Sequence, residues 1–216
     1  LTVAGLGAGP FAWRDPAVRY ELARLASGIT GPVELTLPDP AAETRVATVI
    51  ALKDASFDLT GLKAATPGAE LGGEISFPTG DGAISADLNL VATDVGPLLR
   101  QAGLGAAGSL DARLALFPAP GGQGGELSLD AESLRWLAGM ARPVATRRLS
   151  ATGRLVADER GPGLSLNARA SGITGPSSDL DELRLDLAGP LSALSVGLAA
   201  EGRVLDDRAG RSDQPV

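Results

Sequence analysis

The feature that most restricts the fold of this chain is the alternation of aliphatic residues with polar or small ones, which recurs in segment after segment. It is unbroken from residue 84 to residue 92, where Ile84, Ala86, Leu88 and Leu90 alternate with Ser, Asp and Asn. Successive side chains of a β-strand point to opposite faces of a sheet, so this spacing gives a strand one apolar and one polar face. The sequence therefore predicts an all-β fold.

Turn residues separate the alternating segments, and the chain has 29 Gly and 15 Pro. Short Gly/Pro connections favour an antiparallel meander, because parallel crossovers need longer connections. We expect roughly ten strands of about eight to ten residues. Turns are predicted at 79–82 and at Gly189-Pro190, a longer loop from Pro118 to Gly125, and a bulge or bend at Val49-Ile50.

Three segments depart from the strand pattern. Asp94 can cap a helix over residues 94–104 in which Pro97 takes an early position. Residues 133–141 are predicted to form a second short helix. Residues 15–25 fit a helix that starts at Asp15-Pro16 and a strand about equally well.

Two motifs near the N-terminus bear on organisation. The heptapeptide Ala26 to Pro32, ASGITGP, recurs unchanged as Ala170 to Pro176, so the chain repeats itself in part. The glycine-rich stretch Gly5 to Pro10 fails to match a dinucleotide-binding fingerprint, because Pro10 stands where the third glycine belongs. It is interpreted as a turn between short strands.

Charge and composition exclude several classes of function. A net charge of −7 argues against nucleic-acid binding. The absence of His and Cys removes Ser-His-Asp and Cys-His catalysis, and the densest carboxylate cluster, Asp179, Asp181 and Glu182, is interpreted as solvated. We predict no enzyme activity, no catalytic residue, no metal site and no cofactor.

The apolar face of such a sheet must be covered, because leucine at every second position would otherwise form a very large exposed patch. The longest uncharged run near the C-terminus, Leu187 to Ala200, is too short for a membrane helix, and the first residue is Leu1. We therefore expect a soluble piece of a longer protein, with any anchor or export signal outside it.

Three segments, Leu52 to Phe77, Ala92 to Leu116 and Leu183 to Gly202, resemble the repetitive periplasmic β-region of the TamB and AsmA-like family of bacterial envelope proteins. The resemblance lies in the style of the repeat rather than in an invariant motif.

The domains predicted on this basis are an unassigned N-terminal segment (1–19), a β-repeat groove domain (20–205) and a loop or disordered tail (206–216). The resemblance implies a long curled antiparallel sheet, a half-open tube or taco-like groove, with one or two short helices. It also implies a periplasmic location, tethered to the inner membrane by a segment outside this chain.

The resemblance further implies that the groove shields phospholipid acyl chains between the inner and outer membranes and supports outer-membrane protein assembly. The implied partners are phospholipid, a TamA-like outer-membrane barrel assembly factor and neighbouring segments of the same longer chain. The alternative is a closed β-sandwich or solenoid that acts as a structural spacer or adhesion module without lipid.

On the groove interpretation, the lining residues are the aliphatics on the inward face of the predicted strands. They are Ile84, Leu88, Leu90, Leu110, Leu114, Leu116, Leu127, Leu129, Leu149, Leu155, Leu164, Leu166, Leu183, Leu185, Leu187, Leu194, Val196 and Leu198.

Overall fold

A computed structural model describes residues 5–8, 11–14, 16–38, 43–101, 105–136, 144–158, 161–175 and 178–204. These residues form one antiparallel sheet of 13 strands and a separate pair, β1 (Gly5–Ala8) and β2 (Phe11–Arg14). Within the described residues the single helix is α1 (Gly96–Gln101). The all-β prediction is confirmed.

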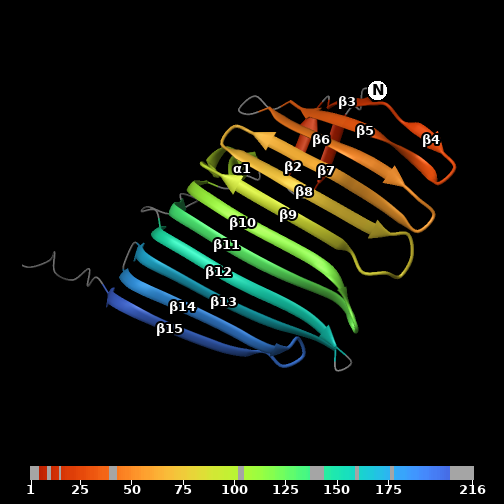
Figure 1. The fold of residues 1–216 in the computed structure, drawn as a ribbon. Helices are drawn as coiled ribbons and strands as arrows, with labels where there is room; N and C mark the ends of the chain where they lie inside the picture. Colours follow the sequence, from red (N-terminus) through yellow and green to blue (C-terminus); the bar gives the residue numbers. More distant parts are fainter. Residues whose placement is uncertain are drawn as a thin grey trace, which may run out of the picture.

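The strands of the large sheet follow one another in chain order, from red and orange to blue in Figure 1. They are β3 (Ala17–Tyr20), β4 (Ala23–Leu25), β5 (Gly28–Leu37), β6 (Thr44–Leu52), β7 (Ser56–Thr66), β8 (Ala69–Pro78), β9 (Ser85–Ala92), β10 (Ala106–Ala119), β11 (Gly122–Trp136), β12 (Val144–Asp158), β13 (Gly161–Thr174), β14 (Ser178–Pro190) and β15 (Ser195–Val204). Both β3 and β4 pair with β5 at one edge, and β15 forms the other. The sheet is therefore open, as predicted.

The core of this sheet consists mainly of alanine. Residues that lie opposite each other on neighbouring strands point to the same face. Along one such row Leu110, Ala131, Leu149, Ala170 and Leu183 alternate large and small side chains across β10 to β14. Among the residues that the structure describes, seven of the ten buried hydrophobic ones are alanines, whereas the leucines of this row are only half-buried. The leucines cover the small residues between them, so the described strands of this sheet form a thin core.

The helix predicted at 94–104 is confirmed over Gly96–Gln101, which form α1; residues 102–104 lie outside the described residues. Asp94 caps it, because its Oδ1 accepts a hydrogen bond from the Gly96 N–H at 2.9 Å. Val95 and Leu99 pack against Ala92 and Leu110 of the sheet. In Figure 1 the helix lies behind the strands, so α1 covers one end of the apolar face.

The second predicted helix is wrong over Ser133 to Trp136, which continue β11 and pair with β12; residues 137–141 lie outside the described residues. Ser133 has a φ of 53° at a register shift between β10 and β11. This bulge separates Ala131 from Leu134 by three positions instead of two. The spacing is typical of a helix, although the backbone is extended.

The predicted loop over 118–125 is also wrong, because only Pro120 and Gly121 lie between β10 and β11. Strands β11 and β12 each have 15 residues, more than the expected length. The bulge predicted at Val49-Ile50 is not found, because β6 pairs with β5 without a shift through both residues. The register of β6 with β7 does shift between Ala47 and Val49, but the extra residue lies in β7, between Thr60 and Lys63.

The segment that fitted helix and strand equally forms the short strands β3 and β4. The two heptapeptides occupy different places. Ala26 and Ser27 form the turn before β5, whereas Ala170 to Thr174 end β13. Identical residues therefore begin one strand and complete another, so the repeat in sequence is not a repeat of the fold.

Candidate apolar lipid-binding face

The strand registers place sixteen of the eighteen predicted lining residues on one face of the sheet. They fall in four rows that cross the strands. The rows are Ala92, Leu110, Ala131, Leu149, Ala170, Leu183 and Ala200; Leu90, Ala112, Leu129, Ala151, Ala168, Leu185 and Leu198; Leu88, Leu114, Leu127, Gly153, Leu166, Leu187 and Val196; and Ala86, Leu116, Gly125, Leu155, Leu164 and Gly189. We call this surface, from β9 to β15, the apolar face.

Two predicted lining residues lie outside the strands, so register does not place them on the apolar face. Ile84 precedes β9, and its backbone N–H and C=O bond to the side-chain amide of Gln123 at 2.8 and 2.9 Å. Leu194 lies in the connection between β14 and β15. Sequence reasoning missed Gln123, whose only signal is an amide side chain in a glycine-rich hairpin.

The apolar face is accessible to solvent. Leu127, in the middle of the sheet, has 37% of its surface exposed, and Leu198 on the edge strand has 69%. The chain exposes 14343 Å² in all. A compact monomer of 21.7 kDa would expose about 9,200 Å². A single-layer sheet contributes to this difference, because both of its faces meet solvent.

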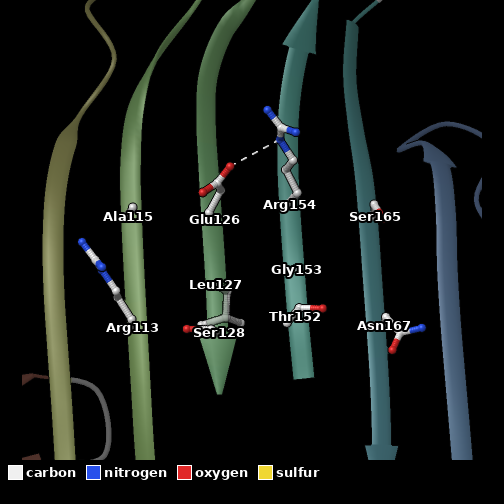
Figure 2. Close-up of a pocket in the computed structure, with 10 residues that line it drawn as sticks. All are labelled: Arg113, Ala115, Glu126, Leu127, Ser128, Thr152, Gly153, Arg154, Ser165 and Asn167. Carbon is white, nitrogen blue, oxygen red and sulfur yellow. Dashed lines mark ion pairs between the residues drawn. The ribbon is translucent and has the colours of Figure 1, made fainter. Parts of the chain in front are cut away.

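The opposite face is polar, and ion pairs between strands cross it. Arg113 Nη2 lies 2.7 Å from Asp87 Oδ2, and Arg154 Nε lies 3.5 Å from Glu126 Oε1. Figure 2 shows these two arginines and Glu126 around a shallow hollow of about 480 Å³. Because each arginine already has a carboxylate partner, the hollow offers a ligand no unpaired positive charge.

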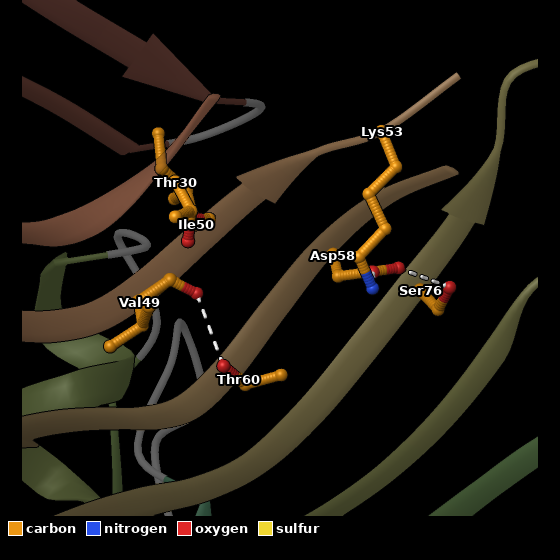
Figure 3. Close-up of polar contacts among 7 residues, drawn as sticks. All are labelled: Thr30, Val49, Ile50, Lys53, Asp58, Thr60 and Ser76. Atoms are coloured by element: carbon orange, nitrogen blue, oxygen red, sulfur yellow. Dashed lines mark hydrogen bonds and ion pairs between the residues drawn. The ribbon is translucent and has the colours of Figure 1, made fainter. Parts of the chain in front are cut away.

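Asp58 is the one charged residue buried within the described sheet. Its carboxylate accepts hydrogen bonds from Lys53 Nζ at 2.7 Å and from Ser76 Oγ at 2.6 Å (Figure 3). The hydrogen bond from Lys53, followed by that from Ser76, lowers the pKa of Asp58 below its ordinary value of 3.8, against the opposing effect of burial. These bonds compensate for the burial of the charge, which is a structural role.

In the acidic cluster Asp179, Asp181 and Glu182, the residue that forms ion pairs is Glu182. Glu182 Oε1 lies 2.7 Å from Arg184 Nε and 3.0 Å from Arg169 Nε. The hydrogen bond from Arg184 lowers the pKa of Glu182, whereas a catalytic acid needs a raised pKa. Among the described residues no group of three or more carboxylates is arranged to hold a metal ion.

Comparison with protein-family models, curated proteins and solved structures found no match to this chain. Among the described residues, no helix is long and apolar enough to span a membrane.

Proposed function

We propose that this chain shields phospholipid acyl chains on its apolar face, as the periplasmic part of an envelope biogenesis protein tethered to the inner membrane. The observation that carries the proposal is the combination of four continuous apolar rows with half-exposed leucines. No second sheet packs over these rows within the described residues. A face of this kind needs an apolar occupant.

Contact area alone can hold such an occupant. Burial of one methylene contributes about 0.8 kcal/mol, so a hydrocarbon tail that lies across several strands is held without ligands for its head group. At Gly125 and Gly153 the nearest side chains are those of Leu116 and Leu166, which lean over the small residues. The rows therefore form a continuous hydrocarbon surface on which a tail can lie.

The resemblance extends the proposal to the wider system. It supports a role in lipid movement between the inner and outer membranes, in outer-membrane protein assembly, and a TamA-like barrel as partner. The proposed activity includes no catalytic step, because shielding a lipid requires only that its tails be kept from water.

The test is mass spectrometry of lipids that copurify with the chain from a bacterial envelope fraction without detergent. We expect phospholipid in near-stoichiometric amount. Leu127→Asp should reduce it severalfold, because the charge must be desolvated beneath a tail. The matched control is Ser128→Asp, one residue away on the polar face, which should retain the lipid.

A stable wild-type chain free of lipid would contradict the proposal and favour a structural spacer or adhesion module. Equal lipid loss in both variants would contradict the assignment of the site to the apolar face. Circular dichroism of each variant separates loss of lipid from loss of fold.

A further inference from the structure

The helix α1 forms a step on the apolar face at one end of the strands (Figure 1). Val95 and Leu99, one helical turn apart, pack against Ala92 of β9 and Leu110 of β10. The Leu99 N–H donates to the Val95 carbonyl oxygen at 2.9 Å, which places these two side chains on the same side of the helix. An α-helix with its side chains is about 10 Å across, so α1 rises well above the strands that it covers.

The two flanks of α1 differ in chemistry. Gly96 and Arg100 share one flank, because a Cβ added at Gly96 would lie 3.2 Å from Arg100 Nη1. The same Cβ would lie 3.2 Å from the carbonyl oxygen of Ala106, so this flank faces the start of β10. Successive residues of an α-helix are about 100° apart, and Leu98 therefore lies about 160° from Gly96, on the other flank. We call this apolar side of α1 the Leu98 flank.

Leu98 contributes an apolar side chain that the core of the sheet does not use. Leu99 packs against the cluster of Ala69, Ala92 and Val95, whereas Leu98 is half-buried and is not part of that cluster of described residues. A helix that lies on a sheet makes a concave corner along each flank. Along the Leu98 flank, the wall of this corner is leucine and its floor is the apolar face.

A hydrocarbon chain in such a corner is held more strongly than one on the open sheet. The corner contacts the chain from two sides, so each methylene buries more apolar area there than it does against the floor alone. Concave apolar surfaces are for the same reason the usual sites of small-ligand binding. The step at α1 thus distinguishes one part of the apolar face from the rest.

We propose that the Leu98 flank is the side wall of the acyl-chain site, with a phospholipid tail in the corner between α1 and the apolar face. The inference rests on the proposed function, and it specifies where on the apolar face a tail is held most strongly. It adds Leu98 to the lining residues. Strand alternation could not identify this residue, because the contact is made by a helix.

Photo-crosslinking compares the two flanks directly. A photoreactive amino acid is placed at Leu98, Arg100 or Leu127, and each chain is irradiated with phosphatidylglycerol that carries an isotopically labelled tail. We expect tail adducts from positions 98 and 127, and severalfold fewer from position 100. Adducts from 127 without adducts from 98, or equal yields from 98 and 100, would overturn the side wall alone. Absence of adducts from all three positions would overturn the proposed function as well.

A matched pair of variants measures the contribution of the wall to affinity. Leu98→Gln should raise the dissociation constant of a phosphatidylglycerol with a fluorescent tail about fourfold, the equivalent of one methylene no longer buried. Arg100→Gln places the same side chain on the other flank and should leave the dissociation constant unchanged. Glutamine favours helix, so both variants should retain α1, and equal unfolding temperatures verify this. An unchanged dissociation constant in Leu98→Gln would contradict the side wall.

Discussion

At the scale of single residues, Asp58 depends most on its hydrogen-bond partners. Replacing it with Ala leaves the Ser76 hydroxyl and the Lys53 ammonium without their carboxylate. We expect the free energy of unfolding to fall by about 1 to 3 kcal/mol, mainly the cost of leaving the half-buried Ser76 hydroxyl unsatisfied, since the exposed Lys53 ammonium can meet water. Urea denaturation measures this change, and the control Asp87→Ala, which removes a solvent-exposed carboxylate, should cause no comparable loss.

The same carboxylate makes stability depend on pH. The pKa of Asp58 is lower in the folded chain than its ordinary value of 3.8, so its contribution is complete above that value. The contribution is lost as the pH falls through the lower, folded pKa. The difference in free energy of unfolding between wild type and Asp58→Ala, measured by urea denaturation, should therefore shrink in acid. A difference that stays constant to the lowest pH would show that the ionised carboxylate of Asp58 is not what stabilises the fold.

At the scale of elements, two adjacent glycines of β8 differ in whether a larger side chain would fit. Gly73 has a φ of 143°, and a Cβ there would lie 2.0 Å from the Asp87 carbonyl oxygen of β9. At Gly72 the nearest atom to an added Cβ is the Leu62 carbonyl oxygen, 3.7 Å away. The close approach of the β9 backbone therefore requires glycine at position 73 only.

This difference gives a matched pair of variants. Gly73→Ala should lower the free energy of unfolding by about 2 kcal/mol or more, because the strained backbone and the clash both oppose the β8 to β9 pairing. Gly72→Ala should be close to neutral. Thermal unfolding of the two variants compares them directly, and equal stability would show that β9 does not approach Gly73 as described.

Elements with strict alternation could be predicted from sequence, and those with bulges could not. Strand β9 has no irregularity within its span, and its pattern was sufficient. In β11, by contrast, the bulge at Ser133 changes the spacing of apolar residues from two to three, which made an extended segment resemble a helix. A bulge of this kind depends on the partner strand, here on Gly108 opposite it, and is not visible in one segment alone.

At the scale of the whole molecule, the common face of sixteen of the eighteen candidate residues could be predicted, because strand alternation alone assigns a face. Whether that face is covered could not be predicted from the sequence, since a closed sandwich and an open sheet share the same alternation. The decisive property is exposure. In the described residues most buried hydrophobic positions are alanine, and the leucines of the apolar rows remain partly exposed, a result of the pairing of strands that no single strand reveals.

The most direct test of the central claim is photo-crosslinking at two neighbouring positions on opposite faces. A photoreactive amino acid is placed at Leu127 or at Ser128, the chain is irradiated in intact bacterial envelopes, and adducts are identified by mass spectrometry. We expect phospholipid adducts from position 127 and few or none from position 128. Absence of lipid at 127, or equal yields from the two positions, would contradict a lipid-bearing apolar face.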